Sequence, residues 1–208
     1  MSTARPLTRR AALVATAAVA ALVLAACGND SGSDSSSTAK DSPTASADAT
    51  AGAHNDQDVS FSQEMIPHHQ QALQMAEMAS AHASSADVKD LASRIEKAQE
   101  PEIKTMAGWL KSWGEDVPGS MPGMDHSTDS DMPGMMDQKD MNELEQSSGK
   151  GFDTMFLTMM IDHHEGAVEM ATTEKDKGEY GPAKSLADDI ITAQNAEIDE
   201  MNKLLGKD

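Results

Sequence analysis

The stretch MIPHHQQALQMA, Met65–Ala76, occurs a second time as MIDHHEGAVEMA, Met160–Ala171. The two copies are offset by 95 residues, and the offset holds without a gap between residues 61–110 and 156–205, where 18 of 50 positions are identical. Adjacent histidines lie between methionines in both copies: His68 and His69 in the first, His163 and His164 in the second. The chain is therefore built on a duplicated unit, and the residue types at the centre of the unit are those of a metal site.

The first copy has the periodicity of an amphipathic helix. At 100° per residue its histidines and apolar residues fall on one face, namely Phe61, Met65, His68, His69, Ala72, Met75, Ala76 and Ala79. We expect a helix over 58–83 and a second over 86–113, ended by Gly114. The repeat predicts a matching pair over 150–177 and 182–206.

The second helix of each pair has its own predicted apolar stripe. The stripes are Leu91, Ile95, Ala98, Met106 and Trp109 in one, and Leu186, Ile190, Ala193, Met201 and Leu204 in the other. Glu102 and Glu197 fall inside these stripes, and Gln99 and Gln194 lie beside them. Pro67 and Pro101 predict local distortions, because proline frees a backbone carbonyl inside a helix.

Two helical hairpins of equal length, each with one apolar face, cannot bury that face alone. Packing them together predicts an all-α fold, a four-helix bundle with approximate two-fold symmetry built from repeats 58–114 and 150–206. The Met-rich linker 115–149 contains Met-Pro-Gly-Met twice and a predicted short helix over 138–147 capped by Asp137. The linker is either a loose trap for soft metal or a flexible loop that packs a few methionines on the bundle.

Composition agrees with a helical core and excludes other classes. The chain has 208 residues with 16 Met but only 3 Phe, 2 Trp and 1 Tyr, so its core is made of Ala, Leu, Ile and Met, which favour helices over sheets. A net charge of -19 is the opposite of a nucleic-acid-binding footprint. The one cysteine, Cys27, excludes a disulfide within the chain and argues against a thiolate zinc site.

The N-terminal region reads as an export signal followed by a tether. Three arginines precede an apolar run that ends in Leu-Ala-Ala-Cys, so residues 1–27 resemble a lipoprotein signal peptide in which Cys27 is lipidated. Residues 28–57 are polar and small, as expected of a disordered tether. We therefore expect a protein anchored to the outer face of the cytoplasmic membrane. Export by the general or the twin-arginine route remains open.

Imidazole and thioether one turn apart can bind one ion, and this combination leans towards copper. A carboxylate di-iron bundle needs Glu-x-x-His pairs, and no histidine of this chain has Glu at that position. The gapless repeat predicts that the two His-His pairs face each other, and that Glu102 and Glu197 accept hydrogen bonds from them. The alternatives are core histidines without metal and glutamates at the bundle's edge. His54, His82 and His126 stand alone and are expected to be solvated.

The doubled Met-Ile-x-His-His-x-x-Ala-x-x-Met-Ala, followed each time by Ala-Gln-x-x-Glu-Ile-x-x-Met, resembles the bacterial domain-of-unknown-function 305 family over residues 58–206. The resemblance implies a ferritin-like four-helix fold, export and, in some members, copper binding. The ligand positions that it implies are Met65, His68, His69, Met75, Met160, His163, His164 and Met170.

Three functions remain open on this basis. The chain buffers or delivers copper or another transition metal, acts as a copper-dependent redox enzyme, or is a metal-free lipoprotein that binds a protein partner.

Overall fold

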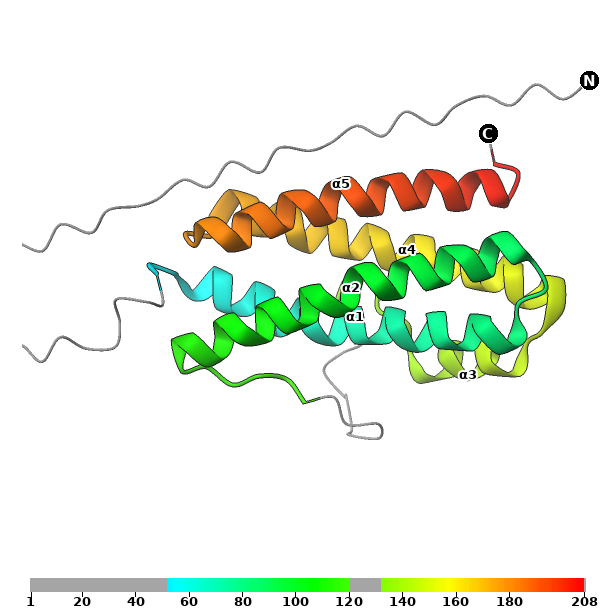
Figure 1. Cartoon of the computed structure of the whole chain (residues 1–208), viewed down its shortest axis with the longest axis horizontal. Helices are drawn as coiled ribbons and strands as arrows, with labels where there is room; N and C mark the ends of the chain where they lie inside the picture. The colour runs from blue at the N-terminus through cyan, green and yellow to red at the C-terminus, as the bar shows by residue number, and fades with distance from the viewer. Residues whose placement is uncertain (1–51, 120–131, 208) are drawn as a thin grey trace, which may run out of the picture. The chain divides into compact units, whose positions relative to one another are not determined.

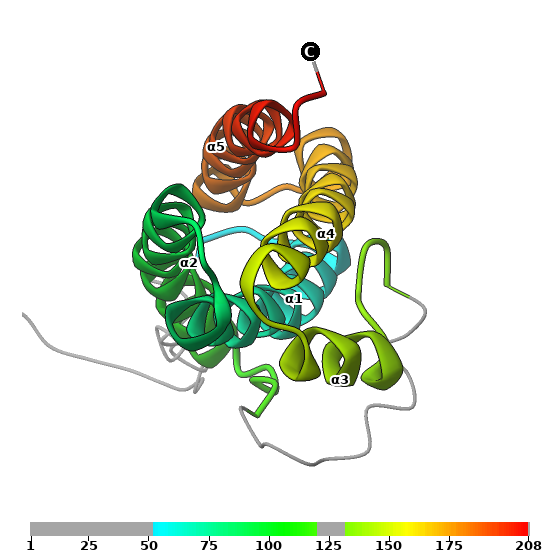
Figure 2. The same cartoon turned by 90° about the vertical axis from the view of Figure 1, so that its right-hand side faces the viewer.

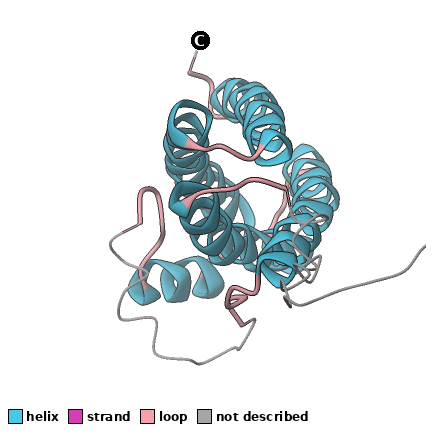
Figure 3. Cartoon of the chain, turned by 90° about the vertical axis from the view of Figure 1, so that its left-hand side faces the viewer, coloured by secondary structure: helices cyan, strands magenta, loops and turns pink. Residues whose placement is uncertain are grey.

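A computed structural model describes residues 52–119 and 132–207. Cys27, nearly all of the predicted tether, the first Met-Pro-Gly-Met and His126 lie outside the described residues. Within them the chain forms five helices: α1 Asp56–His82, α2 Ala86–Trp113, α3 Gln138–Gln146, α4 Gly149–Lys177 and α5 Gly181–Leu204 (Figure 1). Figure 3 shows helices joined by short loops, and no strand, in this part of the chain.

Most helix ends lie where local sequence signals put them. Asn55 and Asp58 form a capping box at the start of α1, and Asp137 caps the predicted short helix α3. Gly114 ends α2 with φ 81°, a conformation that costs a residue with a Cβ considerably more. Pro67 and Pro101 lie inside uninterrupted helices, so the helices continue through both prolines.

The four long helices form the predicted four-helix bundle. α1 packs on α2 and α4 packs on α5, which are the two hairpins of the repeat, and α1 joins the hairpins by packing on α4. The view along the bundle shows α3 outside it, beside α1 and α4 (Figure 2). Among the described residues, no helix combines the length and the apolar character needed to cross a membrane.

The two hairpins cap each other's helices reciprocally. Asp58, near the start of α1, accepts the backbone N–H groups of residues 179 and 180, at 3.2 and 2.9 Å, just before α5. Asp153, which is 95 residues further on in α4, accepts those of residues 84 and 85, at 2.9 and 3.1 Å, just before α2. Since the start of each helix reaches the end of the other, α1 and α4 are antiparallel and the repeats are related by an approximate two-fold axis across the bundle.

The predicted stripes of α2 and α5 are wrong at three positions. Ala98 and Ala193 are exposed, as is Leu204 at 36%, whereas Gln99 and Gln194 are buried. A residue four positions after Ile95 or Ile190 completes one turn and points inwards, and that residue is the glutamine. The sequence rule chose the neighbouring alanine because alanine is apolar.

Candidate metal centre

The four motif histidines lie where α1 crosses α4, and all four are fully buried. The rings of His68 and His163 lie 3.7 Å apart between centroids, tilted by 37°. These two residues occupy equivalent positions of the repeat, so the two-fold axis passes between them. The gapless repeat predicts this meeting of the two motifs, and the structure contains it.

Two of the histidines are held by glutamates on the neighbouring helices. His69 Nε2 lies 2.7 Å from a carboxylate oxygen of Glu102, and His164 Nε2 lies 2.7 Å from one of Glu197. A carboxylate only accepts, so each imidazole donates its Nε2–H, and in the neutral ring Nδ1 carries the free lone pair. The glutamate side chains are 20% and 15% exposed and therefore reach water as well as the histidines.

A third histidine is held by the segment Met132–Met136, which we call the strap. His68 Nε2 lies 3.1 Å from the Pro133 carbonyl oxygen and donates to it, which again leaves Nδ1 with the lone pair. The strap touches α4 at Gly166, where a Cβ would overlap the Pro133 carbonyl. It touches α1 at Gln71, whose amide holds the N–H and the C=O of Met136, both at 2.8 Å.

Burial favours the neutral form of the two central imidazoles, His68 and His163. Desolvation and the neighbouring His69 lower the pKa of His68 to about 3, although its bond to the strap acts in the opposite direction. Desolvation, followed by the effect of His68, lowers the pKa of His163 well below its ordinary value. Neutral imidazole is the form that binds metal, so the lone pairs of these two imidazoles are available at neutral pH.

The Nδ1 atoms of all four histidines are buried without a hydrogen-bond partner, as is Nε2 of His163. A buried polar atom without a partner costs free energy unless a hydrogen bond or a bound ion satisfies it. The same holds for Gln99, whose amide nitrogen and oxygen are both unpaired, and for the amide oxygen of Gln194. The core of the bundle thus contains unpaired nitrogen and oxygen atoms from both copies of the repeat.

The four predicted methionine ligands are buried on the two sides of the histidine layer. Met65 and Met170 belong to one apolar cluster, and Met75 and Met160 belong to the other. Each cluster therefore contains one such methionine from α1 and one from α4, as two-fold symmetry requires. The thioether side chains thus lie in the same core as the imidazoles, on either side of them along the bundle.

The donor set fits a soft or borderline metal ion. Among the described residues, no three His, Cys, Asp or Glu side chains are already arranged around one point. An ion bound here would therefore need ring rotation, or thioether and amide donors beside imidazole. Imidazole with thioether is the donor set that suits copper, and the two glutamates would offset the charge of a bound cation.

Sequence reasoning missed the strap and the contacts of two further histidines. Gly166, a glycine inside a helix, was a signal that another backbone approaches closely, but it did not identify Pro133 as that backbone. His54 stacks on Trp113 at 4.4 Å between ring centroids, and His82 lies 2.9 Å from the Ser147 carbonyl oxygen. Both residues are partly exposed, as expected of solvated histidines, but the expectation that they stand alone is wrong.

A family model described as Domain of unknown function (DUF305) matches residues 58–205. A DUF305 protein of Streptomyces coelicolor is 32% identical, with 73% of this chain and 93% of that chain covered and a TM-score of 0.65. A DUF305 fragment from Deinococcus radiodurans is 30% identical, with 75% and 99% covered and a TM-score of 0.65.

The Cu(I)-bound form of CopM is 37% identical, with 71% of this chain and 94% of that chain covered and a TM-score of 0.58. Similar structures include CopM in Cu(II)-bound, Ag-bound and apo forms. The comparison with curated proteins produced no match.

Proposed function

The chain belongs to the DUF305 family, and from this premise we propose that it is an extracytoplasmic protein that binds copper through paired histidines and methionines. The ligands come from the set Met65, His68, His69, Met75, Met160, His163, His164 and Met170. The role is to buffer copper, to confer resistance to it or to hand it on.

One observation carries the proposal: the Nδ1 atoms of His68, His69 and His164 are buried and unpaired while their Nε2–H groups are held in place. Hydrogen-bonding the far nitrogen fixes the tautomer and the ring orientation of a metal-binding histidine. A histidine that served packing alone would not need its lone pair oriented into the core.

The supporting residues make a cation more acceptable in this core. Glu102 and Glu197 each carry a negative charge one imidazole away from the proposed ion, and Gln99 and Gln194 offer amide oxygens nearby. A bound ion would convert unpaired lone pairs into coordination bonds. The ion would be coordinated by nitrogen and sulfur atoms of this core. The residues of this chain would orient the imidazole rings, exclude water and balance the charge of the ion.

The CopM structures support copper, rather than another transition metal, as the ion that this chain binds. CopM, at 37% identity, was solved with Cu(I) and with Cu(II). Imidazole accommodates both oxidation states, whereas thioether favours Cu(I). A mixed histidine and methionine core is therefore suited to holding copper through a change of oxidation state.

The location forms part of the proposal. Cys27 closes a lipobox-like sequence, and a polar stretch separates it from the bundle. Lipidation at Cys27 would anchor the protein to the outer face of the cytoplasmic membrane and let the bundle meet exported copper. Loss of the first 26 residues removes three arginines and no acidic residue, which takes the charge from -19 to -22 and favours cations over anions.

The test is a copper titration of untagged protein under reducing and oxidising conditions, read by mass spectrometry and by spectroscopy. The variant His69→Ala/His164→Ala removes one imidazole from each copy and should lose high-affinity copper. The matched control His54→Ala/His82→Ala removes two histidines whose contacts lie outside the layer and should bind copper like the parent. Equal binding by both variants, with the fold intact by circular dichroism, would refute the proposal.

A further inference from the structure

A second group of methionines lies on the side of the bundle that α3 covers. α3 and the strap lie against one face of α1, because Gln71 holds Met136 and His82 Nδ1 contacts the Ser147 carbonyl at the end of α3. Gln71 and His82 are eleven residues apart, about three turns, so they share a face. Met78, seven residues after Gln71, lies on that same face.

The adjoining face of α4 also carries methionines. Gly166 marks the face that the strap touches. Met159 precedes it by seven residues and Met155 by eleven, which at 100° per residue returns both to within about 20° of it. Both thioethers therefore point towards the side of α4 that α3 and the strap cover.

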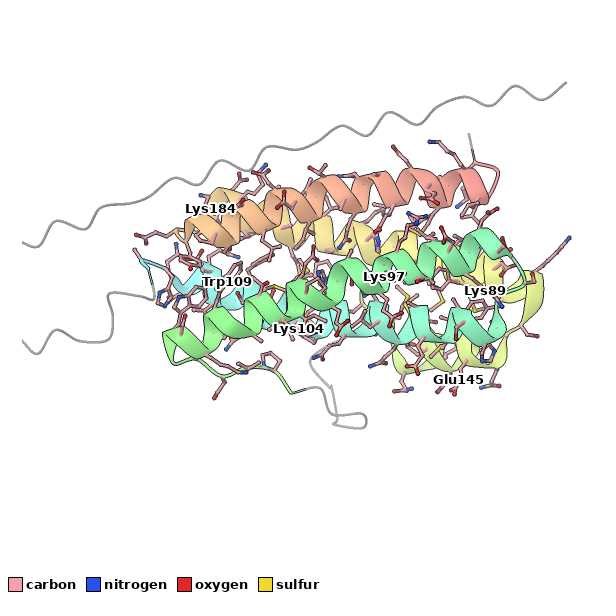
Figure 4. The ribbon with its side chains drawn as sticks, viewed as in Figure 1. Lys89, Lys97, Lys104, Trp109, Glu145 and Lys184 are labelled. Carbon is pink, nitrogen blue, oxygen red and sulfur yellow. The ribbon has the colours of Figure 1, made fainter. Side chains whose placement is uncertain are left out.

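We call Met78, Met136, Met141, Met155 and Met159 the methionine groove. All five belong to or pack against one apolar cluster, which also contains Met75 and Met160, although they come from four different segments. Met141 and Met159 are buried, and Met78, Met136 and Met155 are half-buried. The groove thus combines buried methionines with methionines that solvent partly reaches; Figure 4 draws the side chains of the described residues.

The repeat does not account for these methionines. The positions equivalent to Met155, Met159 and Met78 in the other copy are Ser60, Glu64 and Thr173. An apolar side chain is required where α3 covers the bundle, but leucine or isoleucine would meet that need with better-defined packing. What methionine adds is a polarizable thioether at each position.

We propose that the methionine groove binds a soft monovalent ion, Cu(I) or Ag(I), through thioethers alone, without any of the four motif histidines as ligands. The proposal goes beyond the function proposed above, because it uses none of the histidines. Thioether is a neutral, soft donor that selects Cu(I) over Zn(II). The half-buried methionines give the ion a route from solvent to the buried ones.

The experiment is an Ag(I) titration of the full chain labelled with [methyl-13C]methionine. Resonances of the groove methyl groups, assigned by single Met→Leu variants, should shift with Ag(I) and stay in place with Zn(II). The triple variant Met78→Leu/Met155→Leu/Met159→Leu keeps side-chain volume and should bind one Ag(I) fewer by native mass spectrometry. The control Met201→Leu changes a buried methionine of the same cluster on α5 and should keep the full number.

The two proposals fail separately. In the His69→Ala/His164→Ala protein the groove resonances should still shift with Ag(I). The groove proposal is overturned if those resonances do not respond to Ag(I) in the parent chain, or if the triple variant retains the parental number of ions. The methyl shifts are read on the unsubstituted protein, so they decide the question even where the triple variant folds poorly.

Discussion

Replacing Glu174 by glutamine should stabilise the protein at alkaline pH and leave it unchanged in acid. Glu174 is a fully buried carboxyl of α4, packed against Gly178 and beside Asp58. Desolvation, followed by the hydrogen bond to Asp58, raises its pKa from 4.5 to about 8. Glu174 is thus protonated at neutral pH and donates to Asp58, which stays ionised because it also accepts backbone N–H groups from both hairpins.

The sign and size of this effect on the free energy of unfolding follow from the linkage between protonation and folding. A carboxyl with a raised folded-state pKa stabilises the fold fully below pH 4.5, and that contribution is lost as the pH rises towards 8. One unit is about 1.4 kcal/mol, so the whole shift corresponds to an upper bound of about 5 kcal/mol. Relaxation of this end of the bundle and coupling to Asp58 reduce the expected effect to roughly 2–3 kcal/mol.

Urea unfolding followed by circular dichroism, repeated between about pH 5 and pH 8, measures this effect. The stability of the parent relative to Glu174→Gln should fall steadily with rising pH, since glutamine donates to Asp58 at every pH. Glu169→Gln, a change of an exposed glutamate on the same helix, is the matched control and should follow the parent. Parallel stability curves for the parent and Glu174→Gln would show that Glu174 is ionised in the fold and refute the reasoning.

Three further outcomes are expected. His68→Ala/His69→Ala should abolish high-affinity copper binding if the site is shared, or retain one ion at parental affinity if each copy has its own; unchanged stoichiometry and affinity would contradict both. Glu102→Gln or Glu197→Gln should keep the fold and weaken copper binding roughly ten- to a hundredfold, measured by competition with a chelator, since it alters the acceptor that holds a ligand. Cys27→Ser should leave an unprocessed or released protein in fractionated cells, and normal processing with membrane retention would exclude lipidation there.

The repeat made the fold predictable. A gapless offset of 95 residues fixes the number of long helices, their pairing and the meeting of the two His-His motifs, because a two-fold axis places equivalent residues together. The contacts from His69 to Glu102 and from His164 to Glu197 followed from the cost of a carboxylate in an apolar stripe. Both contacts could be predicted from the sequence because they depend on helical periodicity alone.

The remaining features depend on contacts that periodicity does not encode. Gln99 and Gln194 point inwards although they are polar, and the surroundings that tolerate them come from other helices. The strap reaches His68 from 65 residues away through a backbone carbonyl, which has no side-chain signature. The carboxyl of Glu174 belongs to one copy only, where the other has Ala79, so the repeat could not point to it.

Reciprocal capping by Asp58 and Asp153 gives the hairpins the relationship of two subunits. Residue i of one contacts residue j of the other and j contacts i, which is the pattern of an isologous dimer interface. A hairpin alone would lack the carboxylate that accepts the backbone N–H groups just before its second helix, and the ring that lies against its central histidine, and would need a second copy of itself. The linker joins the two hairpins in one chain and makes their association intramolecular. The protein therefore has the architecture of a homodimer, but the association of its two halves does not depend on protein concentration.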